Sequence, residues 1–194
     1  DTPKWLPVVT SVGAVLLAFI ISGIVLAATG ADPFKIYSYL YKASFGSWGA
    51  FSDVIVKATP LLLIGLGCSL AFRMRLWNIG AEGQFFVGAF MASAVVMVPL
   101  VNLETTPTWA IISLMAVLGM VGGALYAFIP GILKAKLNIN EIITTLMLNY
   151  IAVLWNNYWI FGNWSEAGFQ MTKTFPKVAW LPRLADYAKQ VPAF

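Results

Sequence analysis

The stretch Arg73-Met74-Arg75-Leu76-Trp77-Asn78-Ile79-Gly80-Ala81-Glu82-Gly83-Gln84 interrupts two long apolar runs and decides how the chain folds. Two arginines, an acid and two glycines do not fit inside a continuous membrane-spanning helix. The apolar runs on either side, 54–72 and 85–101, are each long enough at ~1.5 Å per residue to cross most of a ~30 Å hydrocarbon layer. Because every backbone group in lipid needs a hydrogen-bond partner, the interruption is either a tight turn at one membrane face or a re-entrant segment beside a polar path.

The composition is that of an integral membrane protein. Hydrophobic residues make up 60% of the 194 residues and charged residues only 10%, against roughly 25% charged residues in soluble domains, and the mean hydropathy is +0.81. The chain has no histidine and a single cysteine, Cys68, which argues against disulfides within the chain, zinc sites and haem ligation. We therefore expect no metal site and no cofactor in this chain. The basic residues stand singly or in pairs at the ends of apolar runs, a pattern typical of membrane topology and not of nucleic-acid binding.

Hydropathy predicts an all-α, polytopic fold with about five transmembrane helices. Residues 34–51 mix aromatics with lysines and serines and are too polar to cross, so we expect an interfacial amphipathic helix there. The final stretch, 162–194, holds three prolines and mixed charge, and is predicted to be an extracellular loop. The predicted spans are 6–28, 54–72, 85–101, 109–133 and 141–161, within a single transmembrane domain over 1–194.

Two basic pairs predict the orientation. Arg73 and Arg75 follow the second span, and Lys134 and Lys136 follow the fourth, whereas the connection 102–108 carries no base. The positive-inside rule then places both pairs in the cytoplasm and the final loop outside. Four basic residues in that final loop count against this orientation, although long loops follow the rule less strictly.

Small residues recur every four positions in the fourth span. This spacing aligns them along one helix face, on which membrane helices pack closely. The face is a predicted helix-packing surface and not a binding site; its members are Gly119, Gly123, Ala127 and Gly131.

The fifth span has one polar side. At ~100° per residue, Glu141, Thr145, Asn149 and Asn156 fall within an arc of about 80°. Lipid does not accommodate amides and a carboxylate, so this side must face protein or a water-filled route. Asn149 lies ~12 Å inside the span, and either makes a helix–helix hydrogen bond, which we favour, or lines the route.

The interruption also supports two interpretations. In the structural one, Asn78 is a helix N-cap and Glu82 lies in the first turn near Arg73 or Arg75. In the functional one, Gly80 and Gly83 let backbones approach closely and leave amide groups free to meet a polar solute. Taking the second view together with the polar side of the fifth span, the candidate path residues are Trp77, Asn78, Glu82, Gln84, Glu141, Thr145 and Asn149.

Four segments resemble the membrane permeases of bacterial ABC importers for nucleosides, within the wider ribose and branched-chain amino-acid permease family. They are 59–67, 77–84, 130–136 and 140–152, and the string Asn-Ile-Gly-Ala-Glu-Gly-Gln at 78–84 is the most specific. The resemblance covers about 57–152. Trp77 stands where the family usually has Phe or Leu, and Asn138 where it often has Gly, although Asn tolerates the left-handed backbone that Gly would supply.

The resemblance implies a transport subunit, not an enzyme, in the bacterial plasma membrane. It implies a cytoplasmic ATP-binding subunit that holds ATP and Mg, a second permease subunit and an extracellular substrate-binding protein. It also implies that the chain is the N-terminal part of a longer permease. With nucleosides as the solute, Trp77 would stack on a base, and the amides of Gln84 and Asn149 would hydrogen-bond to a base or ribose edge. Sugar or amino-acid import by the same family, or a channel or secondary transporter working without ATP, remain alternatives.

Overall fold

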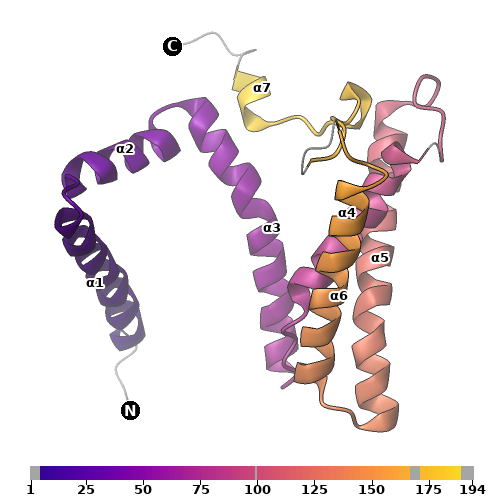
Figure 1. Cartoon of the computed structure of the whole chain (residues 1–194), viewed down its shortest axis with the longest axis horizontal. Coiled ribbons are helices and arrows are strands. Elements are labelled where there is room, and N and C mark those ends of the chain that lie inside the picture. Colours follow the sequence, from indigo (N-terminus) through magenta and orange to yellow (C-terminus); the bar gives the residue numbers. More distant parts are fainter. Residues whose placement is uncertain (1–4, 99, 167–170, 189–194) are drawn as a thin grey trace. The chain divides into compact units, whose positions relative to one another are not determined.

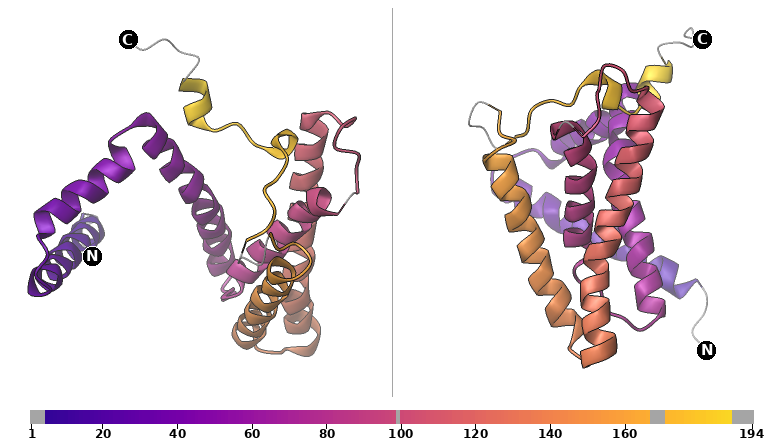
Figure 2. Two further views of the ribbon diagram at one scale, coloured as in Figure 1. Left: turned by 45° about the horizontal axis from the view of Figure 1, so that its top comes forward. Right: turned by 90° about the vertical axis from the view of Figure 1, so that its right-hand side faces the viewer.

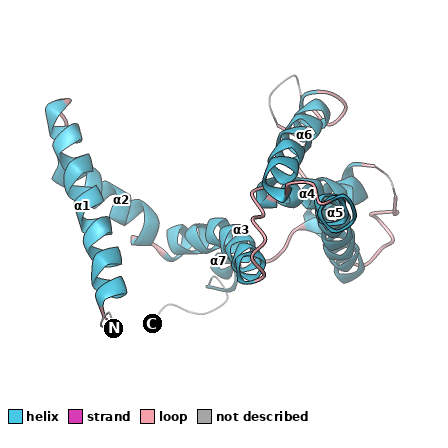
Figure 3. Cartoon of the chain, turned by 90° about the horizontal axis from the view of Figure 1, so that it is seen from below, coloured by secondary structure: helices cyan, strands magenta, loops and turns pink. Residues whose placement is uncertain are grey.

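A computed structural model describes residues 5–98, 100–166 and 171–188, with only the backbone at three of these positions, 7, 187 and 188. Most of this part of the chain is helical (Figures 1 and 3). Its one β-type pairing is an isolated bridge between Ser165 and Thr172. The prediction of an all-α fold is therefore confirmed. The residues group into two compact units, one from 1–56 and 184–194 and the other from 57–183, and each is described by itself.

The first unit holds α1 (Leu6–Ala28), α2 (Pro33–Phe45), the start of α3 (Trp48–Arg73) and α7 (Leu184–Ala188). Asp32 caps α2, because its carboxylate accepts hydrogen bonds from the backbone N–H groups of Phe34 at 3.0 Å and Lys35 at 3.3 Å. The hydroxyl of Tyr37 donates to the backbone carbonyl of Phe19 at 2.7 Å and thereby ties α2 to α1. The interfacial helix predicted over 34–51 is too long, because α2 ends at Phe45 and residues 48–51 belong to the start of α3.

The short helix α7 is tied to the start of α3. The Oγ of Ser52, which is buried, accepts a hydrogen bond from the backbone N–H of Ala185 at 3.2 Å. The indole N–H of Trp48 donates to the carbonyl of Leu184 at 3.4 Å. The stretch predicted as a loop therefore contains this helix and a 3-10 turn, η1 (Lys177–Ala179).

The second unit is built on α4 (Ala81–Met97), which packs against both α5 (Thr108–Leu137) and α6 (Glu141–Phe161) (Figures 1 and 2). The contact between α4 and α5 runs backbone against backbone. A Cβ added at Gly88 would lie 2.9 Å from the carbonyl oxygen of Gly119, and one added at Gly123 would lie 3.2 Å from that of Gln84. Val95 and Ile111 are fully buried in this bundle.

Three helix bounds differ from the predicted ones, while α1 and α6 match theirs. Helix α3 starts six residues before the predicted 54, where the Oγ of Ser47 accepts from the N–H of Ala50 at 3.1 Å. Helix α4 covers 81–97 and not 85–101, because Val98, which precedes a proline, has the extended backbone that such residues favour. Helix α5 runs four residues past the predicted 133.

Among the described residues, three helices are long and apolar enough to cross a membrane: Val8–Ala28 within α1, Trp48–Arg73 and Thr108–Leu137. Helix α4 is apolar but shorter, and α6 has 21 residues with a polar side and is not among the three. The chain is a polytopic membrane protein on this basis, and the count of five spans stays a prediction.

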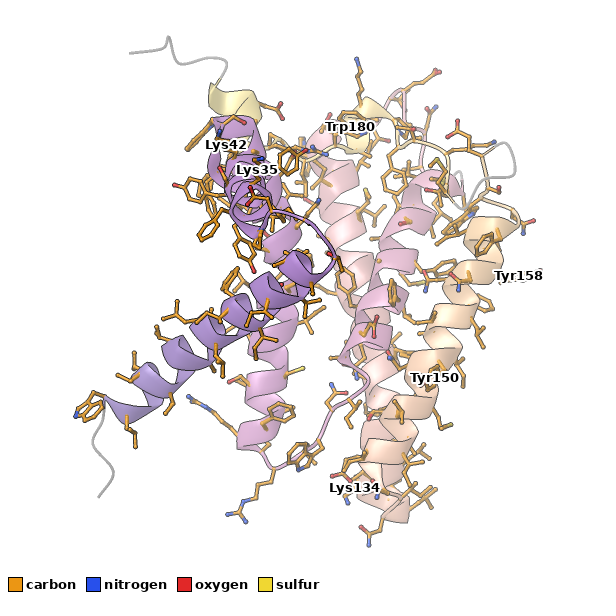
Figure 4. All side chains as sticks on the ribbon, turned by 60° about the vertical axis from the view of Figure 1, so that its left-hand side comes forward. Lys35, Lys42, Lys134, Tyr150, Tyr158 and Trp180 are labelled. Atoms are coloured by element: carbon orange, nitrogen blue, oxygen red, sulfur yellow. The ribbon has the colours of Figure 1, made fainter. Side chains whose placement is uncertain are left out.

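An aromatic cluster closes the bundle at the end where α6 finishes. The rings of Phe90 and Trp164 stack with centroids 4.8 Å apart, and Trp155 and Trp159 lie edge-on or tilted against Phe90 at 5.7 and 5.6 Å. Only 7% of Trp164 is exposed. The cluster holds the segment that follows α6 against α4. Tyr158, which precedes Trp159 of the cluster, lies at the opposite end of the bundle from Lys134 (Figure 4).

Candidate functional site

A cavity of about 450 Å³ lies in the second unit, where α3 and α5 end and α6 begins. Its volume is in the range of small-molecule pockets, ~300 to 1,000 Å³. The turn between α3 and α4 lines it with Met74, Leu76, Trp77 and Asn78, and α3 itself adds Ala71. The remaining lining residues are Gln84 of α4, Ala127, Pro130, Gly131, Lys134 and Ala135 of α5, and Glu141 and Thr145 of α6.

The turn reverses the chain through a left-handed residue. Arg75 has φ 59°, and the N–H of Leu76 bonds to the carbonyl of Ala71 at 3.0 Å, the closure typical of a helix C-terminus. This conformation costs an ordinary L residue roughly 1–2 kcal/mol, so residue type does not predict it at an arginine. As a result Trp77 and Asn78 line the cavity.

The side chains of Asn78 and Gln84 form a reciprocal amide pair. Each NH₂ group donates to the other side-chain oxygen at 3.0 Å. The prediction that Asn78 caps the next helix is wrong: α4 begins at Ala81 with Gly80 as its N-cap, and no side chain bonds there. A primary amide has two N–H groups and two oxygen lone pairs, so the pair leaves each side chain one donor and one acceptor.

A second tight turn, between α5 and α6, places an ion pair on the cavity wall. Asn138 is left-handed with φ 51°, and Asn140 caps α6 by accepting from the N–H of Ile142 at 2.9 Å. Lys134 and Glu141 are thereby brought together at 2.9 Å, with 38% and 18% of their side chains exposed. They are the two charged residues of the lining, which therefore has no net charge.

The polar side of α6 packs against the glycines of α4. A Cβ at Gly80 would lie 2.6 Å from the carbonyl oxygen of Thr145, and one at Gly83 would lie 2.9 Å from the Cα of Asn149. Only 4% of Thr145 is exposed, and its hydroxyl donates to the carbonyl of Glu141 at 2.7 Å. Only a residue without a side chain lets α6 approach this closely, so the contact requires glycine at both positions.

Asn149 joins α6 to α4 away from the cavity lining. Its NH₂ group donates to the carboxylate of Glu82 at 3.2 Å, while its side-chain oxygen is buried without a hydrogen-bond partner. Among the described residues Glu82 makes no ion pair with Arg73 or Arg75. The favoured interpretation of Asn149, a helix–helix hydrogen bond, agrees with this geometry.

The structure therefore separates the candidate path residues into two groups. Five line the cavity, and Glu82 and Asn149 form a contact outside its lining; the functional roles of all seven stay predictions. The cavity residues are Trp77, Asn78, Gln84, Glu141 and Thr145.

The residues of the predicted small-residue face also fall into two groups, one that contacts α4 and one that lines the cavity. Gly119 and Gly123 lie against α4, whereas Ala127 and Gly131 line the cavity, and no atom lies within 4 Å of a Cβ added at Gly131.

Several contacts in this region have no counterpart in the sequence analysis. The hydroxyl of Tyr126 on α5 donates to the carbonyl of Leu148 on α6 at 2.7 Å, and a single tyrosine in an apolar helix was the only available signal. Met74 and Pro130 line the cavity without any local pattern to mark them. Among the described residues, no three acidic, cysteine or histidine side chains come together as metal ligands would.

Comparison with known proteins identifies the family. Residues 50–182 match the family described as "Branched-chain amino acid transport system / permease component". The chain belongs to this family of permeases. No solved structure matches it.

Named relatives differ in their solutes. The chain is 36% identical, over 94% of its length, to the glucose ABC transporter permease protein TsgB13 of Haloferax volcanii. It is 33% identical over 76% of its length to the nucleoside ABC transporter permease protein NupB of Lactococcus lactis, and 35% identical over 75% to the guanosine ABC transporter permease protein NupP of Bacillus subtilis. It spans 47%, 39% and 40% of these three proteins, less than half of each.

Proposed function

We propose that this permease forms part of the translocation path of an ATP-driven importer and that its solute is a nucleoside. The proposal includes a cytoplasmic ATP-binding subunit, which would bind ATP and Mg, a second permease subunit and an extracellular binding protein. Family membership supports the transport role, and the relatives named for nucleosides and guanosine support the solute class.

The observation that carries the choice of solute is the chemistry of the cavity. Its walls are mostly apolar, and its one cation and one anion neutralise each other at 2.9 Å. A nucleotide would place a phosphate charge among groups that leave no net positive charge to receive it. A nucleoside is uncharged and has a flat aromatic base that apolar walls accommodate.

Glucose is the second candidate, because TsgB13 matches the largest share of the chain among the named relatives. A hexose carries hydroxyl groups on nearly every carbon, and each one left unpaired in a desolvated site costs about 1–3 kcal/mol. A nucleoside also carries ribose hydroxyls, but unlike a hexose it has an aromatic base, which the apolar walls and the exposed indole of Trp77 can cover. The chemistry of the cavity therefore favours the nucleoside.

Uptake by cells tests the proposal. The gene is disrupted in its native strain and restored on a plasmid, and uptake of labelled guanosine, uridine and glucose is measured at low concentration. We expect disruption to abolish high-affinity nucleoside uptake and to leave glucose uptake unchanged, with restoration recovering it. Loss of glucose uptake alone would reject the nucleoside in favour of the sugar.

A further inference from the structure

We propose that the turn between α3 and α4 recognises the nucleobase, with the indole of Trp77 stacking on its face and the Asn78–Gln84 pair hydrogen-bonding to its edge. This inference rests on the proposed function and states which part of the nucleoside the cavity recognises. Trp77 and the Asn78–Gln84 pair line the same cavity.

The first step concerns Trp77. It lines the cavity and yet is 58% exposed, so much of its ring surface is uncovered. Phe72 supports the indole from the end of α3, with ring centroids 5.4 Å apart. A supported and uncovered aromatic ring is a stacking platform for any base, whatever the base's hydrogen-bonding pattern.

The second step concerns the amide pair. The two bonds between Asn78 and Gln84 fix the orientation of both side chains without a ligand and leave each one donor and one acceptor. Nucleobase edges present donors and acceptors side by side, and such an edge would meet the remaining N–H of one side chain and the remaining oxygen lone pair of the other. Because the pair is already ordered, a base would bind it without the entropic cost of fixing two flexible side chains.

The third step is that the other polar groups of the lining are committed elsewhere. The hydroxyl of Thr145 donates to the carbonyl of Glu141 at 2.7 Å. The carboxylate of Glu141 bonds to Lys134 at 2.9 Å. Asn78 and Gln84 are the two neutral amides of the lining, each with one donor and one acceptor left, and we assign the base edge to them.

The test compares nucleosides that differ only at the base edge. Every variant is expressed at its native locus with its partner subunits, and uptake is measured per folded transporter. Labelled guanosine and labelled purine riboside, which lacks the exocyclic oxygen and amine, are each supplied at concentrations that saturate the extracellular binding protein, so that the ratio of their uptake rates reports the permease. For the wild type we expect guanosine to be taken up about tenfold faster than purine riboside.

Two substitutions at Gln84 separate the edge contact from folding. Gln84→Met keeps the length of the side chain and removes its hydrogen-bonding groups, and Gln84→Glu keeps the size and removes both N–H donors. We expect either one to bring the uptake rates of the two nucleosides within about twofold of each other, and Trp77→Ala to lower both rates by about tenfold. Asn156→Leu is the control, because the one side-chain hydrogen bond of Asn156 within the described part of the chain goes to the carbonyl of Ala152 on its own helix.

The outcomes distinguish this inference from the function on which it rests. If the wild type takes up guanosine and the folded Gln84 variants keep the wild-type discrimination, base recognition by this turn is refuted and the import function stands. The same conclusion follows if Asn156→Leu abolishes discrimination as strongly as Gln84→Met does. If the wild type takes up no nucleoside, the proposed function fails and the inference fails with it.

Discussion

Asn149 is a polar side chain that contacts a neighbouring helix and does not line the cavity. Its NH₂ group bridges α6 to Glu82 on α4, and its side-chain oxygen is buried close to Gly83. We predict that Asn149→Leu lowers the free energy of unfolding by about 1 kcal/mol, because the hydrogen bond to the carboxylate of Glu82 is lost. Uptake per folded transporter should fall by a similar factor for all nucleosides. Thermal unfolding of the purified transporter and uptake of several nucleosides provide the measurement.

The matched control at the residue scale is again Asn156→Leu, which breaks a bond within one helix and should shift unfolding far less. Unchanged stability together with loss of one nucleoside alone would contradict the packing role of Asn149. It would place this side chain on the solute path after all.

Small residues of α5 allow this helix to pack closely against α4. Gly123 faces the backbone of α4 at Gln84, whereas Gly131, two steps along the same stripe, has open space at its Cβ position. We predict that Gly123→Leu forces α4 and α5 apart and lowers the yield of folded protein severalfold, without changing solute preference. Gly131→Leu should keep the yield, because nothing lies within 4 Å of its Cβ position. Size-exclusion chromatography in detergent measures both, and equal yields would contradict the packing assignment of Gly123.

Most of the helical plan could be predicted from the sequence. Hydropathy gave the bounds of α1 and α6, and residue type is compatible with the N-cap at Asn140 and the left-handed Asn138, because amide side chains tolerate both conformations. Asn78 met the same local criterion for a cap but lies within reach of Gln84, and the amide pair formed instead. A local sequence pattern indicates which hydrogen bonds a residue can make. Which partner it bonds to depends on tertiary packing.

The site was predictable only in part for the same reason. Periodicity placed Glu141, Thr145 and Asn149 on one side of α6, and they do face α4 and the turn before it. The ion pair of Lys134 with Glu141 and the left-handed Arg75 depend on how two turns fold in three dimensions. No spacing within a single helix encodes either of them.

The positions of the two basic turns in the second unit predict how the chain is oriented in the membrane. Met74 and Lys134 line the same cavity, so both basic turns lie at one end of the bundle, and α4 ends and α5 begins at the other (Figure 1). We predict that, after Cys68→Ser, Lys136→Cys reacts with a membrane-impermeant thiol reagent only in permeabilised cells, whereas Glu104→Cys reacts in intact cells. Labelling of Lys136→Cys from outside in intact cells would invert this orientation.

ATP-dependent uptake by proteoliposomes is the most direct test of the central claim. The transporter is purified from its native strain with its partner subunits, reconstituted, and supplied with its binding protein outside and Mg-ATP inside. We expect labelled guanosine to accumulate against its gradient only when both are present, with unlabelled nucleosides competing and glucose failing to compete. Accumulation of glucose in place of guanosine, or equal guanosine uptake without ATP, would contradict ATP-driven nucleoside import.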